Sequence, residues 1–249
     1  MDIWTNIVTW FTDLQAEFVL NFIAKNRWKL IVDGLGNTLI ITIFSCLIGI
    51  ALGIIIAIVR STWDNSNKTM HHGVGKTMLR ITNRLCVIYT TIIRGTPVVI
   101  QLLIMYYIIF ASSNNGLMIA IFAFGLNSGA YVSEIFRGGI LSIDKGQMEA
   151  GRSLGLTYIQ TMRLIIAPQV LKNVLPTLAN EFIVLLKETS VAGYVAVVDL
   201  TFAGNRIRGI TYSAFMPLIA VALIYLLIVM FLTWLVGKLE RRLRQGDIR

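Results

Sequence analysis

The amino-acid sequence predicts an all-α integral membrane protein with about five transmembrane helices. Three observations lead to this fold class: little charge, a high mean hydropathy, and several runs of about 20 apolar residues, the length that crosses a bilayer as a helix. Of the 249 residues, 56% are hydrophobic and only 14% are charged, against about 25% charged residues in an ordinary soluble domain. With a mean hydropathy of +0.73, the composition excludes both a soluble globular enzyme and a disordered chain.

The cysteine content and the net charge argue against two kinds of binding site. Cys46 and Cys86 stand alone, so they support neither a disulfide framework nor a metal-ligand cluster, and we predict no metal site. The net charge of +9 is compatible with a nucleic-acid partner, but in so hydrophobic a chain it is more typical of cytosolic loops. We therefore expect no nucleic-acid binding.

Residues 1–33 are predicted to form an N-terminal amphipathic segment ahead of a membrane domain at residues 34–240. The start does not resemble a signal peptide, because Asp2 stands where a basic residue is expected and no small-residue cleavage site follows an apolar core. Polar residues at positions 13, 15 and 17 interrupt any spanning run, so we expect a helix on the outer membrane surface, with a sixth span as the alternative. Its apolar face consists of Trp4, Ile7, Phe11, Leu14, Phe18 and Phe22.

Five spans are predicted along the membrane domain. The three secure ones are residues 37–59, 116–136 and 212–236. A shorter apolar run at residues 98–110 and a more polar one at residues 171–186 are the other two. Small residues repeat every fourth position in the first and third spans, which predicts faces where helices pack closely. These residues are Ser45, Gly49, Gly53 and Ala57, and then Gly125, Gly129 and Ser133.

The second span is interrupted at its start. Pro97 follows Thr96, and a proline after a threonine cap is typical of the first position of a helix. One interpretation starts the span near Pro97, with residues 85–93 as an elbow at the inner surface. The other is a single long helix that is kinked at Pro97.

Basic residues orient the spans. With the N-terminus outside, sixteen Lys and Arg residues fall in or beside the inner loops and tail, and six fall outside. This bias predicts an N-out, C-in protein, with residues 241–249 as a basic cytosolic tail. The same basic residues are suited to contact membrane lipid headgroups.

The loop at residues 138–169 is long, cytosolic and rich in apolar residues. Glu149 is expected in the first turn of a short helix, where the helix dipole favours a carboxylate, and Gly155 is expected to end that helix. A second helical stretch follows and is expected to stop at Pro168. A helix–glycine–helix knob of this kind is suited to dock in a groove of another protein.

Ionisable and polar residues within the spans mark a candidate substrate site, because charge inside a bilayer is costly. Glu181 and Glu188 lie on one face of the fourth helix, and Asn127, Ser128 and Tyr131 form a polar patch in the third. Together they supply acceptors for the ammonium and donors for the carboxylate of an amino acid. Asn127 and Ser128 alternatively bond only across helices.

Glu134 lies near the inner end of the third span, three residues before Arg137, and the two are predicted to form a gate or an ion pair. The embedded carboxylates favour a substrate with positive charge or an accessible ammonium. Anionic glutamate fits less well, because Glu181 repels it unless protonated.

Residues of the cytosolic loop resemble the EAA motif of ABC-importer permeases. In that motif Glu-Ala-Ala is followed by three residues, a glycine, nine residues, an isoleucine, one residue and Leu-Pro. Glu149, Ala150, Gly155, Ile165 and Pro168 occupy matching positions. The chain departs from the motif with glycine at position 151 and alanine at position 167.

Three further stretches are similar to the polar amino-acid branch of these permeases, namely residues 94–101, 128–139 and 180–190. The last of these adds Thr189 and Ser190 to the candidate substrate site. The resemblance spans roughly residues 34–240. It implies a MetI-like ABC permease fold and a permease subunit that moves a polar or cationic amino acid across a bacterial cytoplasmic membrane by alternating access.

The resemblance also implies the partners. A second permease copy or a paralogue completes a dimer, two ATP-binding cassette subunits dock on the cytosolic knobs, and an extracytoplasmic binding protein delivers the amino acid. The chain itself is then no enzyme and binds no cofactor, because ATP and Mg are used by the partner ATPase. The residues expected to couple to that ATPase are Glu149, Ala150, Gly151, Arg152, Gly155 and Pro168. The alternative function is a stand-alone ion channel or secondary transporter.

Overall fold

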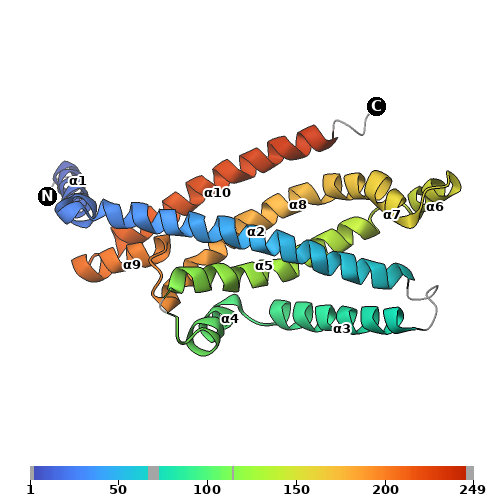
Figure 1. Ribbon diagram of the computed structural model, residues 1–249. Helices are drawn as coiled ribbons and strands as arrows, with labels where there is room; N and C mark the ends of the chain where they lie inside the picture. The colour runs from blue at the N-terminus through green and yellow to red at the C-terminus, as the bar shows by residue number, and fades with distance from the viewer. Residues whose placement is uncertain (1–2, 67–72, 114, 245–249) are drawn as a thin grey trace.

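The computed structural model describes residues 3–66, 73–113 and 115–244, and within these ranges the chain is helical without any β-strand (Figure 1). Three helices are long and apolar enough to cross a membrane: α2 (Trp28–Ser66), α5 (Gly116–Leu141) and α10 (Phe215–Arg244). The all-α membrane class is therefore confirmed. Residues 245–249 of the predicted basic tail lie outside the described residues.

The predicted second span consists of two separate helices and is not one long kinked helix. α3 (Val74–Gly95) and α4 (Val98–Ile104) meet at an angle of 110°, and a π-helical turn, η3 (Met105–Ile109), continues α4. The expected elbow at residues 85–93 is too short, because α3 begins at Val74. Pro97 is the N-cap of α4, with an extended ψ of 136°, and not its first helical residue.

α8 (Ala167–Glu188) packs against α5 and α10 and contains the more polar span predicted at residues 171–186, although it is not among the described helices that are apolar enough to cross a membrane. It continues directly from α7 (Tyr158–Thr161) through the π-helical turn η4 (Met162–Ile166), so the expected stop at Pro168 is wrong. The π-turn shifts the backbone hydrogen bonds just before the proline, and the start of a helix is where a missing N–H costs least.

One end of the bundle is closed by η5 (Thr189–Val195) and α9 (Leu200–Thr211), and α6 (Lys145–Ser153) lies with α7 at the opposite end (Figure 1). α9 starts at the fully buried Asp199, whose carboxylate accepts the backbone N–H groups of Thr201 and Phe202. Burial raises the pKa of the Asp199 carboxyl, and these two hydrogen bonds partly counteract that rise. α10 begins at Phe215 and not at the predicted position 212, because Tyr212 ends α9 with a φ of 55°.

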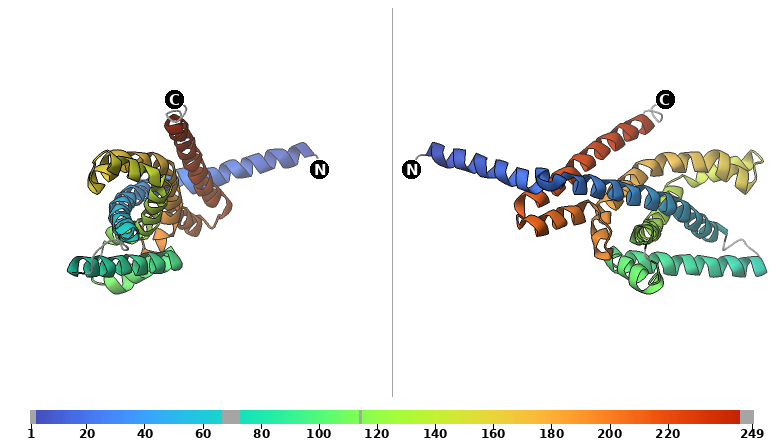
Figure 2. Two further views of the ribbon diagram at one scale, coloured as in Figure 1. Left: turned by 90° about the vertical axis from the view of Figure 1, so that its right-hand side faces the viewer. Right: turned by 60° about the vertical axis from the view of Figure 1, so that its left-hand side comes forward.

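The N-terminal helix α1 (Ile3–Phe18) is joined to α2 by two short turns, η1 (Val19–Ile23) and η2 (Ala24–Asn26). Figure 2 shows α1 pointing away from the bundle and across its long axis. The attachment is polar: the fully buried Asn21 donates to Ser213 and accepts from Thr211 at 2.7 Å. Trp10 and Phe11 of α1 are exposed within the single chain.

The centre of the bundle is the close contact between α2 and α5 predicted by the small residues. A Cβ added at Gly53 would lie 2.5 Å from a methyl of Val132, and one at Gly49 would lie 2.7 Å from the Ser128 hydroxyl. Ser45 donates across the contact to the carbonyl of Ile121 at 2.9 Å. The predicted packing faces are confirmed, and they leave no room for even one methyl group.

Candidate functional site

Ser128 of α5 and Glu181 of α8 meet inside the bundle. The Ser128 hydroxyl donates to the Glu181 carboxylate at 3.5 Å, and Ser128 is fully buried beneath Gly49 of α2. The two polar patches proposed on separate spans therefore lie side by side at this point. No ion pair joins a basic side chain to Glu181 within the part of the chain that the structure describes.

The outer residues of the predicted site behave differently from one another. Glu188 ends α8 seven residues, or two helical turns, beyond Glu181, and is partly exposed. Thr189 is fully buried and donates to the carbonyl of Leu186 at 2.7 Å, so its hydroxyl is used within its own turn. Ser190 follows in η5 and is partly exposed.

The predicted patch on α5 faces two directions. Asn127 donates to the side chain of Gln101 in α4 at 3.0 Å, and the ring of Tyr131 lies beneath the Arg94 guanidinium at 5.5 Å. Successive helix residues differ by about 100° in direction, so Asn127 turns toward α3 and α4 while Ser128 turns toward α8. Gln101 was not among the predicted site residues; its position within residues 94–101 was the only signal for it.

Glu134 lies in a cluster of arginines in the C-terminal half of α5. Arg137 lies 3.0 Å from one carboxylate oxygen, as expected from the three-residue spacing. Arg60 of α2 pairs with the other oxygen, and Arg94 of α3 lies 3.9 Å from it. Sequence spacing found Arg137 but missed Arg60 and Arg94, because both come from other helices.

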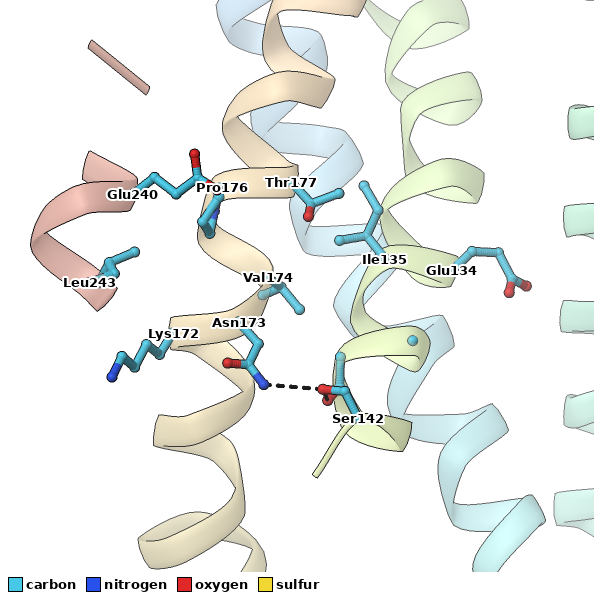
Figure 3. A pocket seen from close by; sticks show the side chains of 12 residues that line it. Glu134, Ile135, Ser142, Lys172, Asn173, Val174, Pro176, Thr177, Glu240 and Leu243 are labelled. Atoms are coloured by element: carbon cyan, nitrogen blue, oxygen red, sulfur yellow. Dashed lines mark hydrogen bonds between the residues drawn. The ribbon is translucent and has the colours of Figure 1, made fainter. Parts of the chain in front are cut away.

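A cavity of about 630 Å³ opens between α5, α8 and the end of α10 (Figure 3). Ser142, Asn173 and Thr177 are among its polar lining residues, and Asn173 donates to Ser142 at 3.1 Å. Figure 3 shows that the Glu134 carboxylate points away from this cavity. The cavity thus begins one helical turn below Glu181 and runs toward the end of the bundle that carries α6.

Residues 138–169 form the expected helix–glycine–helix knob. Gly155 has a φ of +83°, a left-handed conformation that glycine adopts without strain, and it follows Leu154, the C-cap of α6. Gly151 is buried against Thr161, where an added Cβ would lie 2.5 Å away from a methyl. Leu154 is 81% exposed, so the tip of the knob presents an apolar side chain to its surroundings.

The other knob residues are placed as follows. Ala150 and Arg152 are exposed on α6, and Pro168 lies in the first turn of α8. Glu149 is also exposed, but its expected place in the first turn is wrong. α6 begins four residues earlier, at Lys145, because Asp144 caps it by accepting the N–H of Gly146.

Comparison with known proteins matches this architecture to one family. The family model described as the inner membrane component of binding-protein-dependent transport systems matches residues 74–245. The chain belongs to this family. The permease is therefore a multi-pass membrane transport subunit and not an enzyme.

Three similar proteins agree with the match to the family model. The arginine transport system permease protein ArtQ of Bacillus subtilis is 35% identical over 221 residues, which cover 87% of this permease and 94% of that protein. The glutamine transport system permease protein GlnP of Escherichia coli is 37% identical over 168 residues, 66% and 77% of the two chains. The crystal structure of an amino acid ABC transporter with histidines superposes with a TM-score of 0.76 at 35% identity, covering 89% of this permease and 98% of that chain.

Proposed function

We propose that this permease translocates a cationic amino acid through an ATP-driven importer by alternating access. The hydrogen bond between Ser128 and Glu181 inside the bundle is the observation that supports this substrate class. Glu188 lies on the same helix face, and neither carboxylate pairs with a basic side chain among the described residues. A bound cation would supply the missing charge, since an embedded carboxylate is stabilised by a positive partner.

The relatives support an amino-acid substrate. Their names specify arginine, glutamine and an amino acid transporter with histidines. An α-ammonium group is common to all of these, and arginine and protonated histidine carry a further cationic side chain. In our assignment, Glu181 accepts the substrate cation, Ser128 contributes a hydroxyl, and Glu188 with Ser190 lies on the outer approach.

The transport assembly we propose contains four further subunits. A second permease copy or a paralogue completes the pore, and two ATP-binding cassette subunits dock on the knobs formed by α6 and α7. An extracytoplasmic binding protein delivers the amino acid at the end of the bundle that carries α9. The exposed tip at Leu154 and the buried, closely packed Gly151 favour this docking site, because they present an apolar contact on a well-ordered support.

We place the N-terminus outside and the C-terminus inside the bacterial cytoplasmic membrane, with α1 on the outer surface. The excess of basic residues near the inner loops supports this orientation. Its test is thiol labelling of sealed cells in a background without Cys46 and Cys86. An impermeant reagent should modify Ser112→Cys and miss Arg242→Cys; the reverse result would invert the topology.

Uptake by the reconstituted importer tests the substrate class. Proteoliposomes would contain the permease with its ATPase and binding-protein partners, and uptake would be compared for arginine, lysine, glutamine and glutamate. We expect arginine or lysine to be transported best and glutamate least. Preferred uptake of glutamate would overturn the assignment of Glu181, and a complete absence of ATP-dependent amino-acid uptake would overturn the importer itself.

The docking role of the knob has its own test. Any side chain at Gly155 resists its left-handed conformation, at about 1 kcal/mol or more, and would change the direction in which α7 leaves. We expect Gly155→Asp to abolish most substrate-stimulated ATP hydrolysis, while Glu149→Ala, in the middle of α6, has the milder effect. Full stimulation and full uptake by Gly155→Asp would show that the ATPase docks elsewhere.

A further inference from the structure

The junction between α3 and α4 leaves backbone groups without helical partners in a pair of helices that together are apolar enough for one bent membrane span. The last carbonyl groups of α3 have no continuing helix to pair with, because Thr96 is extended and Pro97 begins the turn into α4. In a bilayer such groups need partners from the protein, since lipid offers none. The break is therefore stable only where another group donates to it.

Gln101 is the side chain that donates to this break. Its amide nitrogen lies 2.7 Å from the carbonyl of Ile93, 3.0 Å from the carbonyl of Thr96 and 2.9 Å from the Thr96 hydroxyl. Gln101 sits one turn into α4, so it reaches back over the bend and ties the two helices together. The Thr96 hydroxyl also donates to the carbonyl of Ile92 at 2.8 Å, so Gln101 and Thr96 both support the 110° angle, and of these two only Gln101 does so from α4.

The other half of the same amide faces α5. The Gln101 carbonyl accepts a hydrogen bond from Asn127 at 3.0 Å, and Asn127 is only 2% exposed. Asn127 precedes Ser128, whose hydroxyl donates to Glu181. A continuous set of contacts therefore leads from the helix break, through Gln101 and Asn127, to the residue beside the proposed substrate carboxylate.

We propose that Gln101 is a positioning residue for transport, which sets the α3–α4 angle and links it to the substrate-facing part of α5. The inference rests on the proposed function in one respect, that Ser128 and Glu181 contact the substrate. A shift of α5 on substrate binding moves Asn127, and through Gln101 it changes the support of the break. Gln101 does not contact the substrate in this assignment, because both ends of its amide are occupied by the protein.

Three variants distinguish the hydrogen bonds of Gln101 to the helix break from its hydrogen bond to Asn127 in α5. Gln101→Glu keeps the acceptor for Asn127 but removes the donors to Ile93 and Thr96. Asn127→Ala removes only the link to α5, and Gln101→Leu removes both halves. Ile100→Ala, at the exposed neighbouring position of α4, is the matched control.

Uptake is the first measurement. In proteoliposomes with the ATPase and binding protein, we expect each of the three variants to lower the maximal uptake rate about tenfold, because each removes a hydrogen bond that fixes the break or its link to α5. The loss should be equal for arginine, lysine and glutamine, whereas a substrate-contacting residue would change the preference among them. The Asn127→Ala and Gln101→Leu losses should not add in the double variant. Uptake within twofold of the wild type, or a loss confined to one amino acid, would overturn the proposal.

Spin-label distances are the second measurement and need no transport. Labels at Ile88→Cys in α3 and Ile108→Cys in η3, both exposed, report the angle of the break in a background without native cysteines. We expect Gln101→Glu to broaden the distance distribution and Ile100→Ala to leave it unchanged. An unchanged distribution in Gln101→Glu would refute the role of Gln101 at the break. If the wild type shows no amino-acid uptake, the proposed function fails, and these distances still decide whether Gln101 holds the break.

Discussion

Glu134 and Glu181 are two carboxylates on neighbouring helices of the same bundle, and their surroundings are opposite. Glu134 pairs with Arg60 and Arg137 and has Arg94 at 3.9 Å. Glu181 has the neutral hydroxyl of Ser128 as its partner. One carboxylate is paired with basic side chains of the protein, while the other has no such partner among the described residues.

This contrast shows that two acidic residues within the same helix bundle can have very different surroundings. The Glu134 cluster joins three helices, because its arginines come from α2, α3 and α5. Glu134 is among the residues that line the cavity below the proposed substrate site, but its carboxylate points away from the cavity toward these arginines (Figure 3). Glu181 has a single side-chain hydrogen bond among the described residues, to Ser128 at 3.5 Å, and this long contact is consistent with the transport role that we propose for it.

The largest effect on stability is expected from removing the carboxylate of Glu134. Glu134→Ala leaves Arg60 and Arg137 without their counter-charge, and stranding partly buried charges costs about 2–4 kcal/mol. Thermal unfolding of the detergent-purified permease measures the loss, with Glu181→Ala as the matched comparison. Equal destabilisation by the two variants would remove the distinction between the two carboxylates.

The next effect concerns transport and should reverse the order of the two residues. Glu181→Gln keeps shape but removes the charge, so uptake of arginine should fall about tenfold or more, the equivalent of about 1.4 kcal/mol of lost stabilisation. Folding should be unimpaired, because a neutral amide costs less to bury than a carboxylate. Uptake assays and thermal unfolding on the same preparations check both statements. Unchanged uptake with normal protein levels would leave Glu181 as a helix–helix contact.

A smaller effect is expected from the coupling between Arg60 and Glu134. In a double-mutant cycle with Arg60→Met and Glu134→Gln, the double variant should be more stable than the sum of the single losses predicts, by about 1 kcal/mol. The same cycle between Arg60 and Glu181 should give no coupling, since these two residues share no contact in the structure. Additive losses at Arg60 and Glu134 would contradict the ion pair.

The smallest effect is expected at the rim of the cluster. Arg94 is 45% exposed, against 17% for Arg60, and lies farther from the Glu134 carboxylate. Exposed ion pairs contribute little, so Arg94→Gln should change stability by about 0.5 kcal/mol or less, including its contact with the Tyr131 ring. A loss as large as that of Glu134→Ala would mean that Arg94 belongs to the centre of the cluster.

The sequence predicted what depends on local spacing. The spacing of small residues identified the α2–α5 contact, and the position of Gly155 identified the turn in the knob, where φ is +83°. Apolar runs located the three longest spans because length and hydropathy are properties of a single segment. The start of α6 was predicted too late, near Glu149, where the motif begins. The helix starts at Lys145 because Asp144 caps it.

Contacts between distant segments were beyond sequence reasoning. Arg60 lies 74 positions before Glu134, and nothing in its neighbourhood marks the pairing. In the sequence, Gln101 is an ordinary polar residue in an apolar run. Its contacts with Ile93 and Asn127 exist only because of the bend and the packing of α4 on α5. Ser128 and Glu181 were both identified, but their meeting depends on how α5 and α8 pack.

The close fit of α2 on α5 has a mechanical consequence for the whole permease. Because Gly49 and Gly53 leave no space for a methyl group, we expect the two closely packed helices to move together as one rigid unit. α5 is joined to α6 by a short connection, and Ser128 lies near the middle of α5. In the importer that we propose, a movement of the knob would therefore be transmitted through α5 to Ser128 and Glu181.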